Sequence, residues 1–506
     1  MSRNNTQGPR ASKAFLLKAH DSAQYVKLPL IMKTGLLIAL GAYFFLLAGA
    51  GLLFSRKSRS LEDFFLASRS LSPGVMALSL CAAWFGASSI LVSADEACRA
   101  GVSAFMIVGL PAVLTVLLFA FFFAGRIHGL PTISLSDLVE VRYGRAVRRL
   151  ATALIVWYMV MLAASQMVAA GQFLKGFMGT SYLVSVVVAA AVVLLYATFG
   201  GLLSVARADA LQFFLLASGI GGLCVSLMGR SSFREAGVLA SQAGIRGFFD
   251  FFHGFGRNGL IALSFTLAWT VSPVAWQRIQ AVRTAKHAKW GLLASAGLLA
   301  SLYALIVAAG ILFRPVLGAP ADGSPLLARF IASASGPWLG GLLFVAVMAA
   351  ILSTLDAAVN TGALCLARDV YEQIFPRSSG RRLVAAGRWS TLVVGGAALA
   401  VAFRFQDILK TLGLASQIMA EGLFIPGMAM LFLKKKLPAA GLLSLLLGGG
   451  FSLLSFLNDA GIVHLGLPGW PRSVPLGMAL SAAGFIIGSG ISIVRRKRRN
   501  PWPSET

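Results

Sequence analysis

The chain has 506 residues, of which 57% are hydrophobic and only 12% are charged. Soluble domains carry about 25% charged residues, so this chain lacks the polar surface that a soluble core would need. Its formal net charge of +26 does not point to nucleic acid, because the Lys and Arg residues lie in short loops rather than in a basic soluble module. The composition instead predicts the lipid bilayer as the surrounding medium.

Apolar stretches of about 20 residues, each long enough to cross a bilayer, recur along the chain. We predict an all-α polytopic membrane protein with thirteen transmembrane helices. Their ranges are 29–54, 74–97, 103–125, 150–174, 182–199, 208–228, 259–277, 291–313, 338–366, 388–405, 409–433, 437–457 and 473–494. Between the sixth and seventh, an aromatic patch at 248–255 suggests an interfacial helix.

Basic residues are concentrated in alternate loops, as they are in cytoplasmic loops, and they also suit contact with anionic lipid headgroups. They lie at 56–59, 142–149, 278–289, 434–436 and 495–499. This pattern predicts a multi-pass protein of the cell membrane with its N-terminus outside and its C-terminus in the cytoplasm. The N-terminal tail is also basic, but the separate basic loops outweigh it.

Ten of the predicted helices form two sets of five. A set with an odd number of spans is followed by a copy of opposite orientation, and inverted repeats around a midplane site are a common transporter plan. We therefore divide the chain into five parts. They are an extracytoplasmic tail at 1–28, an extra helix at 29–54, an inverted-repeat core at 74–433, two C-terminal helices at 437–494 and a basic cytoplasmic tail at 495–506.

The first of four unusual segments lies at 77–101, where small residues interrupt an apolar span. Small side chains permit either close helix packing or a broken helix with free carbonyl groups. In the second reading, carbonyl groups near Ala82 and Phe85 coordinate a cation. Asp95 and Glu96, near the outer end, are expected to be solvated.

Two further segments place a carboxylate inside a span, where an unpaired charge is costly. Asp209, at the start of its helix, either binds a cation or pairs with Arg207 at the membrane surface. Asp356 lies in an oxygen-rich stretch and shares a helix face with Ser353. Hydroxyl groups that bond back to their own helix would explain Ser353 and Thr354 but not Asp356, so we favour a cation site there.

The fourth segment contains Pro273, which frees a carbonyl group one turn earlier and predicts a kink. Phe265, Trp269 and Trp276 lie at helical spacing around it. Such an aromatic stripe is more typical of packing or of an interfacial belt than of a ligand cage. Both interpretations stay open.

Together the four segments resemble the sodium/solute symporter family, which includes proline and pantothenate permeases and the sodium–glucose cotransporters. The resemblance covers residues from about 60 to 435. In the segment GGLLSVARADALQ, Ala208 replaces the usual Thr, and the residues that match the family motif are Gly200, Gly201, Ser204, Val205, Asp209 and Gln212. The segment STLDAAVNTGALCLARDVY resembles the eighth core helix with its following Asp369 and Tyr371.

The resemblance implies a five-plus-five inverted repeat and a sodium site between the first and eighth core helices. Carried over by position, the sodium ligands are Ala82, Phe85, Ala350, Ser353 and Thr354. Some members have a second cation site that uses the carboxylate matching Asp209. Here Asp356 replaces one hydroxyl of that site, so a second cation and a shared proton both stay open. The solute-facing positions implied by the resemblance are Ser88, Phe265 and Trp269.

We therefore predict a sodium-coupled symporter that imports a small organic solute by alternating access. A proton-coupled symporter of the same fold is the alternative, and a solute sensor on a transporter scaffold or a passive channel are rivals of other classes. An enzyme is not expected, because no His or Cys cluster has the spacing of a nucleophile or metal site. The four cysteines are scattered and are expected to be buried small residues. Neither the solute nor the oligomeric state follows from the sequence.

Overall fold

The computed structural model describes residues 30–55, 66–130, 132, 134–178, 180–198, 202–319, 325–433 and 435–499. Within these ranges the chain folds into helices, and the isolated β-bridge found there joins Leu71 to Val282. The predicted tail at 1–28, the last residues of the predicted basic tail and the two motif glycines at 200 and 201 lie outside the described residues.

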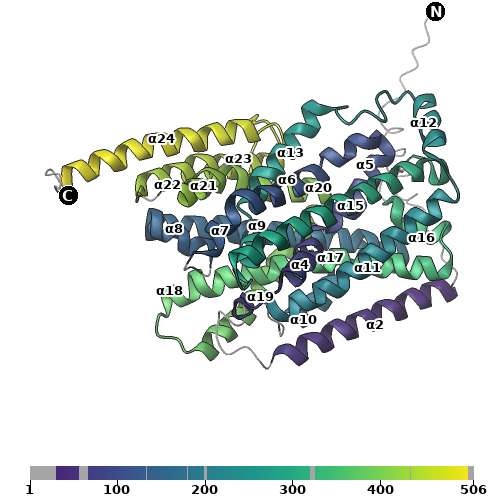
Figure 1. Ribbon diagram of the computed structural model, residues 1–506, viewed down its shortest axis with the longest axis horizontal. Helices are drawn as coiled ribbons and strands as arrows, with labels where there is room; N and C mark the ends of the chain where they lie inside the picture. Colours follow the sequence, from purple (N-terminus) through teal and green to yellow (C-terminus); the bar gives the residue numbers. More distant parts are fainter. Residues whose placement is uncertain are drawn as a thin grey trace, which may run out of the picture.

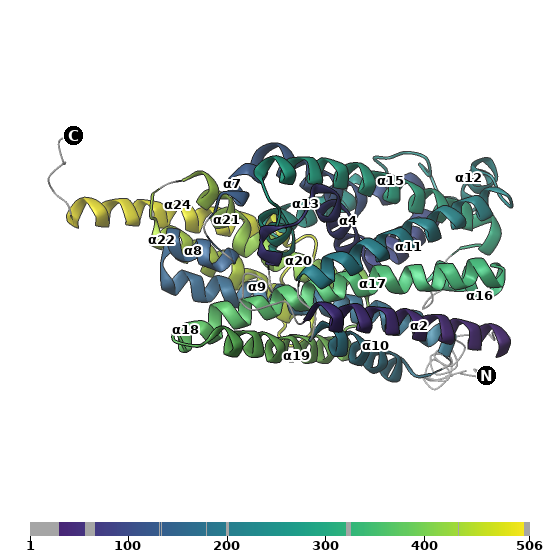
Figure 2. The same cartoon turned by 60° about the horizontal axis from the view of Figure 1, so that its bottom comes forward.

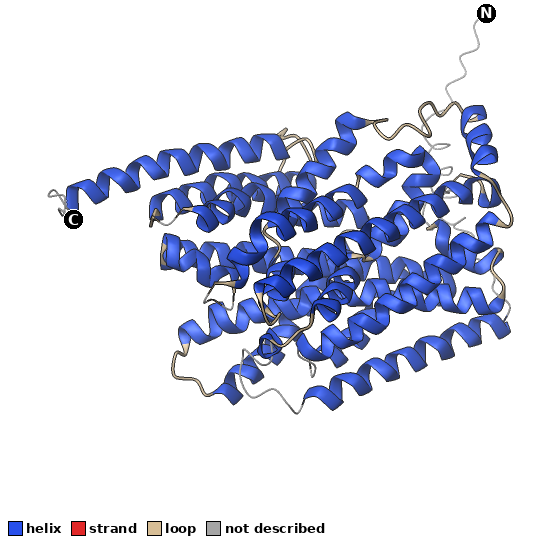
Figure 3. Ribbon diagram, viewed as in Figure 1, coloured by secondary structure: helices blue, strands red, loops and turns tan. Residues whose placement is uncertain are grey.

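The helices run along one common direction and form a bundle (Figures 1 and 3). Figures 1 and 2 show that α8, α18 and the end of α24 lie at one end of the bundle, called the α8 end, and that α12 and α16 lie at the other. The helices of the first half are α2 (Leu30–Ser55), η1 (Ala67–Arg69), α4 (Pro73–Trp84), η2 (Ser88–Val92), α5 (Ser93–Ala100), η3 (Gly101–Met106), α6 (Gly109–Leu118), η4 (Phe119–Phe123), α7 (Ala124–His128), α8 (Leu135–Tyr143), α9 (Arg145–Met178), α10 (Tyr182–Ala197), α11 (Leu202–Met228) and α12 (Phe233–Gln242). Those of the second half are α13 (Phe255–Thr270), α14 (Pro273–Gln280), α15 (Ala285–Leu317), α16 (Leu326–Ser333), α17 (Pro337–Cys365), η5 (Leu366–Tyr371), α18 (Glu372–Ile374), α19 (Gly380–Arg404), α20 (Ile408–Ile418), η6 (Met419–Leu423), α21 (Phe424–Phe432), α22 (Pro438–Ser444), η7 (Leu445–Gly449), α23 (Gly450–Asp459) and α24 (Val474–Arg499).

Among the described residues, nine helices are long and apolar enough to cross a membrane, and the bent pair α13–α14 makes ten. Shorter apolar helices lie in α2, α4 and α10. The long apolar stretch Ser88–His128 contains parts of two predicted spans, which Gly101 separates with a φ of +73°. A Cβ at Gly101 would collide with the Phe248 carbonyl group, so this turn requires glycine. The helices follow the predicted ranges, while the total of thirteen stays a prediction.

The span that contains α17 forms the centre of the bundle. Of its most apolar stretch 89% is buried, compared with 28% for the spans of α19 and α24. It packs against α4, α9 and α11, and small residues along it allow this close approach. The outer helices expose apolar side chains such as Val393 and Ile486, as expected for helices that face lipid.

The predicted interfacial helix at 248–255 is wrong. In this connection α12 comes earlier, the aromatic residues lie in turns, and α13 begins only at Phe255. Gly247 and Gly254 have positive φ values of +65° and +69°, which a helix does not accommodate. The carbonyl group of Phe248 accepts a hydrogen bond of 3.0 Å from the backbone N–H of Val102. The connection is thereby fastened to the end of the first core span.

Candidate functional site

The first core helix is broken inside the bundle. α4 ends directly before Phe85, whose φ of −88° and ψ of 65° are not helical, and helix resumes at Ala87. A Cβ at Gly86 would lie 2.5 Å from Thr354 Oγ1 and 2.8 Å from Gln166 Oε1. The backbone N–H of Ala87 donates to Gln166 Oε1 at 2.9 Å. Small residues at 77–101 therefore provide both the close packing and the break that the sequence left as alternatives.

Oxygen atoms from α4 and α17 meet beside this break. Ser353 Oγ donates to the Ala82 carbonyl oxygen at 2.7 Å and lies 3.0 Å from the Ala350 carbonyl oxygen. Thr354 Oγ1 is 3.3 Å from the same Ala350 oxygen, and all these residues are buried. One hydroxyl hydrogen cannot serve two carbonyl groups fully, so the cluster is rich in acceptors. Unwound backbone carbonyls with nearby hydroxyls are the donor set that holds Na⁺ in transporters.

A small cavity adjoins these oxygen atoms. Its volume is about 30 Å³, and its walls include Ser88, Trp269 and Tyr158. A water molecule needs at least about 10–15 Å³ of such space, so the cavity holds about two waters but no organic solute. Ser88 and Trp269 therefore face the cavity as the resemblance implied. Phe265 is fully buried and stacks on Trp269, with 5.0 Å between ring centroids and 6° between planes, so it supports that wall from behind.

Three polar residues of this cavity were not predicted from the sequence. Tyr158 and Gln166 project from α9, and Ser272 lies at the 41° bend between α13 and α14. This bend confirms the kink predicted at Pro273. Gln166 had a usable signal, because a lone amide inside an apolar span is expected to have a partner or a function. No such sequence signal marked Ser272, because its position in the cavity depends on how the bent pair α13–α14 packs.

Asp209 forms a buried ion pair. Its Oδ2 lies 3.0 Å from Nη2 of Arg278 and accepts a hydrogen bond of 2.6 Å from Ser79 Oγ. Arg278 Nε also donates to Ser79 Oγ, at 2.9 Å. The side chains of Arg278 and Asp209 are 0% and 1% exposed. Asp209 therefore pairs with Arg278 inside the bundle rather than with the exposed Arg207 at the membrane surface.

Asp356 lies close to this ion pair but is not part of it. Its side chain is buried, and within the described part of the chain its Oδ1 has no hydrogen-bond partner. It interacts electrostatically with Asp209, which repels its charge, and with Arg278, which attracts it. One guanidinium thus lies near two carboxylates, and it is Asp209 that it contacts directly. If both are ionised, one negative charge remains for a bound cation or a proton to neutralise.

Asp95 has a structural partner, so the expectation that it is solvated is wrong for this residue. Its Oδ1 accepts a hydrogen bond of 2.8 Å from the backbone N–H of Leu326, at the start of α16. Glu96 is half-buried beside it. In the described part of the chain, neither carboxylate is among the residues that line the central cavity.

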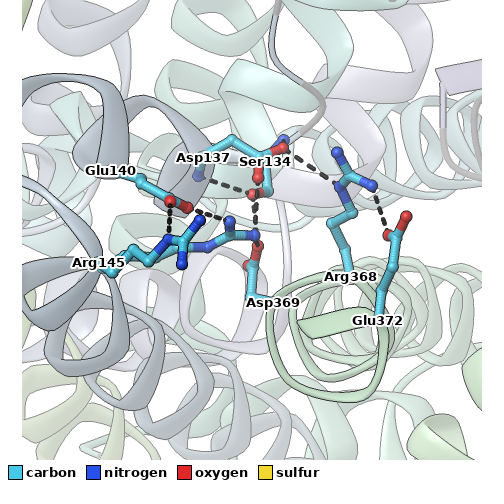
Figure 4. Close-up of polar contacts among 8 residues, drawn as sticks. Ser134, Asp137, Glu140, Arg145, Arg368, Asp369 and Glu372 are labelled. Carbon is cyan, nitrogen blue, oxygen red and sulfur yellow. Dashed lines mark hydrogen bonds and ion pairs between the residues drawn. The ribbon is translucent and has the colours of Figure 1, made fainter. Parts of the chain in front are cut away.

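Charged side chains from three segments meet at the α8 end (Figure 4). Arg148 of α9 lies 2.7 Å from carboxylate oxygens of both Asp137 and Asp369, and it also binds Glu140. The hydrogen bond from Arg148 holds the pKa of the Glu140 carboxyl below its usual value. Ser134 Oγ donates to Asp369 at 2.8 Å, so Asp369, matched by the sequence motif, joins η5 to the start of α8. The members of this Arg148 cluster are Ser134, Asp137, Glu140, Arg145, Arg148, Arg368, Asp369 and Glu372.

Comparison with known proteins explains this arrangement. Residues 64–449, most of the chain, match the model of the sodium:solute symporter family. The chain belongs to the sodium:solute symporter family. The matched residues include the helix break at Phe85 and the oxygen-rich part of α17, so the resemblance in the sequence analysis is confirmed.

Characterised symporters of this family are similar along most of their length. The sodium/glucose cotransporter of Vibrio parahaemolyticus is 27% identical over 434 residues, covering 77% of this chain and 78% of the relative. The high-affinity proline transporter of Bacillus subtilis is 25% identical over 448 residues, 83% of this chain and 92% of the relative. The sodium/pantothenate symporter of Escherichia coli is 23% identical over 479 residues, 90% and 97%.

Solved transporter structures share the fold of this symporter. A Na⁺-coupled sialic acid symporter in a substrate-bound, outward-open state superposes with a TM-score of 0.77 at 17% identity, covering 90% of this chain and 97% of that one. Mhp1, a nucleobase-cation-symport-1 family transporter in a closed conformation, gives a TM-score of 0.51 at 16% identity, covering 89% and 97%. The predicted fold class, an all-α five-plus-five inverted-repeat core with flanking helices, is confirmed.

Family membership also confirms the broader functional predictions. The protein is a multi-pass membrane symporter of the sodium-coupled class, and a small molecule is its solute. The relatives named above are transporters, so the prediction that the chain is not an enzyme is confirmed as well.

Proposed function

We propose that this symporter imports a small organic solute by alternating access and that one sodium ion binds between α4 and α17. The proposed ligands are the backbone oxygens of Ala82, Phe85 and Ala350 and the hydroxyl groups of Ser353 and Thr354. The hydrogen bond of 2.7 Å between Ser353 Oγ and the Ala82 oxygen carries this proposal. It joins atoms 271 residues apart in the sequence, at the place where α4 loses its helical hydrogen bonds.

The small size of the central cavity suggests how sodium and solute are coupled. A cavity of about 30 Å³ must enlarge before a solute enters, and this requires the helices around it to move apart. A sodium ion that bridges α4 and α17 favours the conformation in which both helices supply ligands. Because an ion with equal affinity for two states shifts neither, this preference is what would couple sodium to solute binding.

The cavity walls limit the chemistry of the proposed solute. The described lining residues include three aromatic side chains, Trp84, Tyr158 and Trp269, and no carboxylate, lysine or arginine. Gln166 and Ser88 provide amide and hydroxyl groups. We therefore expect a small polar solute without net charge, packed against the aromatic rings. The roles proposed for Ser88 and Trp269 are direct contact with the solute, and that of Phe265 is support of Trp269.

The direction of insertion is also proposed from the charges. The basic residues at 142–149 and 495–499 lie at the α8 end (Figures 1 and 2). Positive residues are retained on the cytoplasmic side during insertion. This supports a cytoplasmic α8 end and C-terminus, with the N-terminus outside.

The surroundings of Asp356 favour an alternative to coupling by one sodium ion. In this alternative, a second ion binds, or a proton replaces sodium. Asp356 and Asp209 share the single charge of Arg278, which leaves room for one further positive charge. A second sodium ion or a proton on Asp356 would each supply it. Transport driven by a proton gradient in the absence of sodium would support the proton.

Reconstituted uptake tests the proposal. A thermal-shift screen of the purified protein with small metabolites, in sodium and in potassium, first identifies a ligand, because a bound ligand stabilises by mass action. Uptake of that ligand into proteoliposomes should then follow an inward sodium gradient. Ser353→Ala removes one proposed ligand, and the sodium concentration for half-maximal uptake should rise by about tenfold or more.

Thr391→Val is the matched control for this experiment. Thr391 is buried on α19, and its hydroxyl bonds only to the Gly387 carbonyl of its own helix, at 3.0 Å, among the interactions described. Sodium dependence should be unchanged in this variant. If Ser353→Ala also keeps the sodium dependence of the unmodified protein, the proposed site is wrong. Ligand binding without accumulation would indicate a sensor, and accumulation that never exceeds equilibrium would indicate a channel.

A further inference from the structure

A second and much larger cavity lies on the outside of the bundle and is separate from the central cavity. This groove has a volume of about 830 Å³ and is enclosed by α9, the η5–α18 end of the central span, and α19. It shares no described lining residue with the central cavity. Ala153, Val370 and Ala397 border it and are exposed, so the groove opens toward the surroundings of the bundle.

The groove changes in chemical character along α9. Arg145, Arg148 and Arg149 lie at its α8 end, while Val156 and Val160 lie at the other. The distance from Arg145 to Val160 along a helix is about 22 Å, since each residue adds 1.5 Å. The groove therefore runs from a basic mouth into an apolar interior along the direction in which the helices cross the membrane.

The basic mouth has unused hydrogen-bonding capacity. The Arg145 side chain is 82% exposed, and Arg149 is also exposed. Deeper in the groove, Arg148 Nε, Thr152 Oγ1 and Trp157 Nε1 are buried and have no hydrogen-bond partner among the residues described. Buried donors without partners are uncommon because each costs free energy. These atoms indicate a polar ligand that reaches one to three helical turns below the mouth.

The net charge of the lining fits an anion. The lining holds three arginines and one carboxylate, Asp369. Arg148 is also paired with Asp137 and Glu140, and Arg145 with Glu140, so Arg149 and the exposed side of Arg145 carry the positive charge that an anion would meet. A ligand with a phosphate at one end, polar ester groups below it and a long apolar tail matches the groove in this order. Lipid is the surrounding medium of a membrane protein, and basic pockets between transmembrane helices bind anionic headgroups.

We propose that this groove binds one anionic phospholipid. The phosphate lies against Arg145 and Arg149, the glycerol and ester region lies near Thr152, and one acyl chain lies along Val156 and Val160 on α9 and Val401 on α19. The lipid contacts α9, the η5–α18 end of the central span and α19. The first two contain members of the Arg148 cluster, and α19 follows that cluster in the chain. It thereby connects the outer helix α19 to α9 and to the end of the central span.

Lipid binding to the purified full-length protein in detergent tests this proposal. The probes are phosphatidylglycerol and phosphatidylcholine with identical acyl chains, and glycerol 3-phosphate, which has the anionic group without the chains. Native mass spectrometry counts bound lipids, and thermal unfolding reports stabilisation. Phosphatidylglycerol should bind in one copy that survives mild activation and should raise Tm more than the other two probes do.

Variants of the mouth locate the site. The double variant Arg145→Gln/Arg149→Gln should weaken phosphatidylglycerol binding by about tenfold or more, because it removes charge-assisted hydrogen bonds to phosphate. The matched control is Arg381→Gln/Arg382→Gln, which removes two exposed arginines at the start of α19, outside the described groove lining. Equal affinity of both double variants would overturn the proposal, as would equal stabilisation by the two phospholipids.

Variants of the apolar wall distinguish a lipid from other occupants. Ala153→Trp fills the groove and should prevent binding, whereas Ala400→Trp, at an exposed α19 position outside the described lining, should not. If glycerol 3-phosphate stabilises as strongly as the lipid, the site binds a soluble phosphate and the lipid proposal is wrong. It is also wrong if Ala153→Trp converts a dimer into a monomer, because the occupant is then a second copy of the chain.

Discussion

The middle and the end of the central span hold two buried aspartates in different surroundings. At the end, one oxygen of Asp369 accepts from both Arg148 and Ser134. In the middle, Asp356 has an oxygen without a partner in the described residues, and its neighbour Asp209 already occupies Arg278. The other oxygen of Asp369, like Oδ1 of Asp356, has no hydrogen-bond partner among the described residues, so the two aspartates differ in the direct ion pair that Asp369 makes with Arg148. A directly paired carboxylate holds segments together, whereas one without such a pair leaves a negative charge to be neutralised. This contrast supports a structural role for the end of the span and the proposed ion-coupling role for its middle.

The largest loss of stability is expected for Asp209→Asn. This change leaves Arg278, which is 0% exposed, without a negative partner in direct contact. Removal of one charge from a buried pair typically costs about 3–5 kcal/mol, and the thermal unfolding of the purified protein should show it. The double variant Asp209→Asn/Arg278→Gln should recover part of the loss. Stability close to that of the unmodified protein would show that Asp356 or another group replaces Asp209 as the partner.

A smaller loss is expected for Arg148→Gln in the Arg148 cluster. The side chain is 7% exposed and binds three carboxylates, so its loss should cost about 2 kcal/mol, between the values for exposed and buried pairs. The depressed pKa of Glu140 should rise toward its usual value in this variant. A carboxyl group whose pKa is lower in the folded than in the unfolded protein stabilises the fold above its unfolded pKa, and this stabilisation is lost as the pH falls. The variant should therefore lack the part of the acid-induced loss of stability that comes from Glu140.

Arg145→Gln is the control for this comparison within the same cluster. Its side chain is 82% exposed, and its partner Glu140 keeps the hydrogen bond to Arg148. Stability should therefore change little. If both variants lose the same amount in thermal unfolding, the burial of Arg148 does not determine its contribution, and the structural role assigned to the end of the central span fails.

The smallest change in stability, but a large change in transport, is expected for Asp356→Asn. The Oδ1 atom has no described partner to lose, and repulsion from Asp209 disappears, so stability should stay within about 1 kcal/mol. The ion dependence of proteoliposome uptake should change, either by loss of one sodium ion from the stoichiometry or by loss of proton dependence. Undiminished sodium dependence in both Asp209→Asn and Asp356→Asn would remove these residues from ion coupling.

Local features of the proposed sodium site could be predicted from the sequence. Clustered small residues left close packing and a helix break near Phe85 as alternatives, and hydroxyls at Ser353 and Thr354 predicted a polar face inside an apolar span. The partner of Asp209 was harder to predict because Arg278 is 69 residues away. Helix geometry nevertheless disfavoured Arg207, because residues two positions apart do not face each other.

Features that depend on several helices were not accessible from the sequence. The groove beside α9 requires three segments that the chain brings together only on folding. The aromatic residues at 248–255 had the composition of an interfacial helix, but Gly247 and Gly254 adopt positive φ values that interrupt it. Backbone conformation, and not composition, decided the structure of this segment.

The contact between Gly101 and Phe248 has a practical consequence for measuring motion. The backbone hydrogen bond from Val102 ties the long connection to the end of the first core span, so the connection should travel with that span during transport. Phe252 in this connection is 64% exposed, and the four native cysteines are buried. A fluorophore attached to Phe252→Cys would therefore label one surface position selectively and report the movement of this connection.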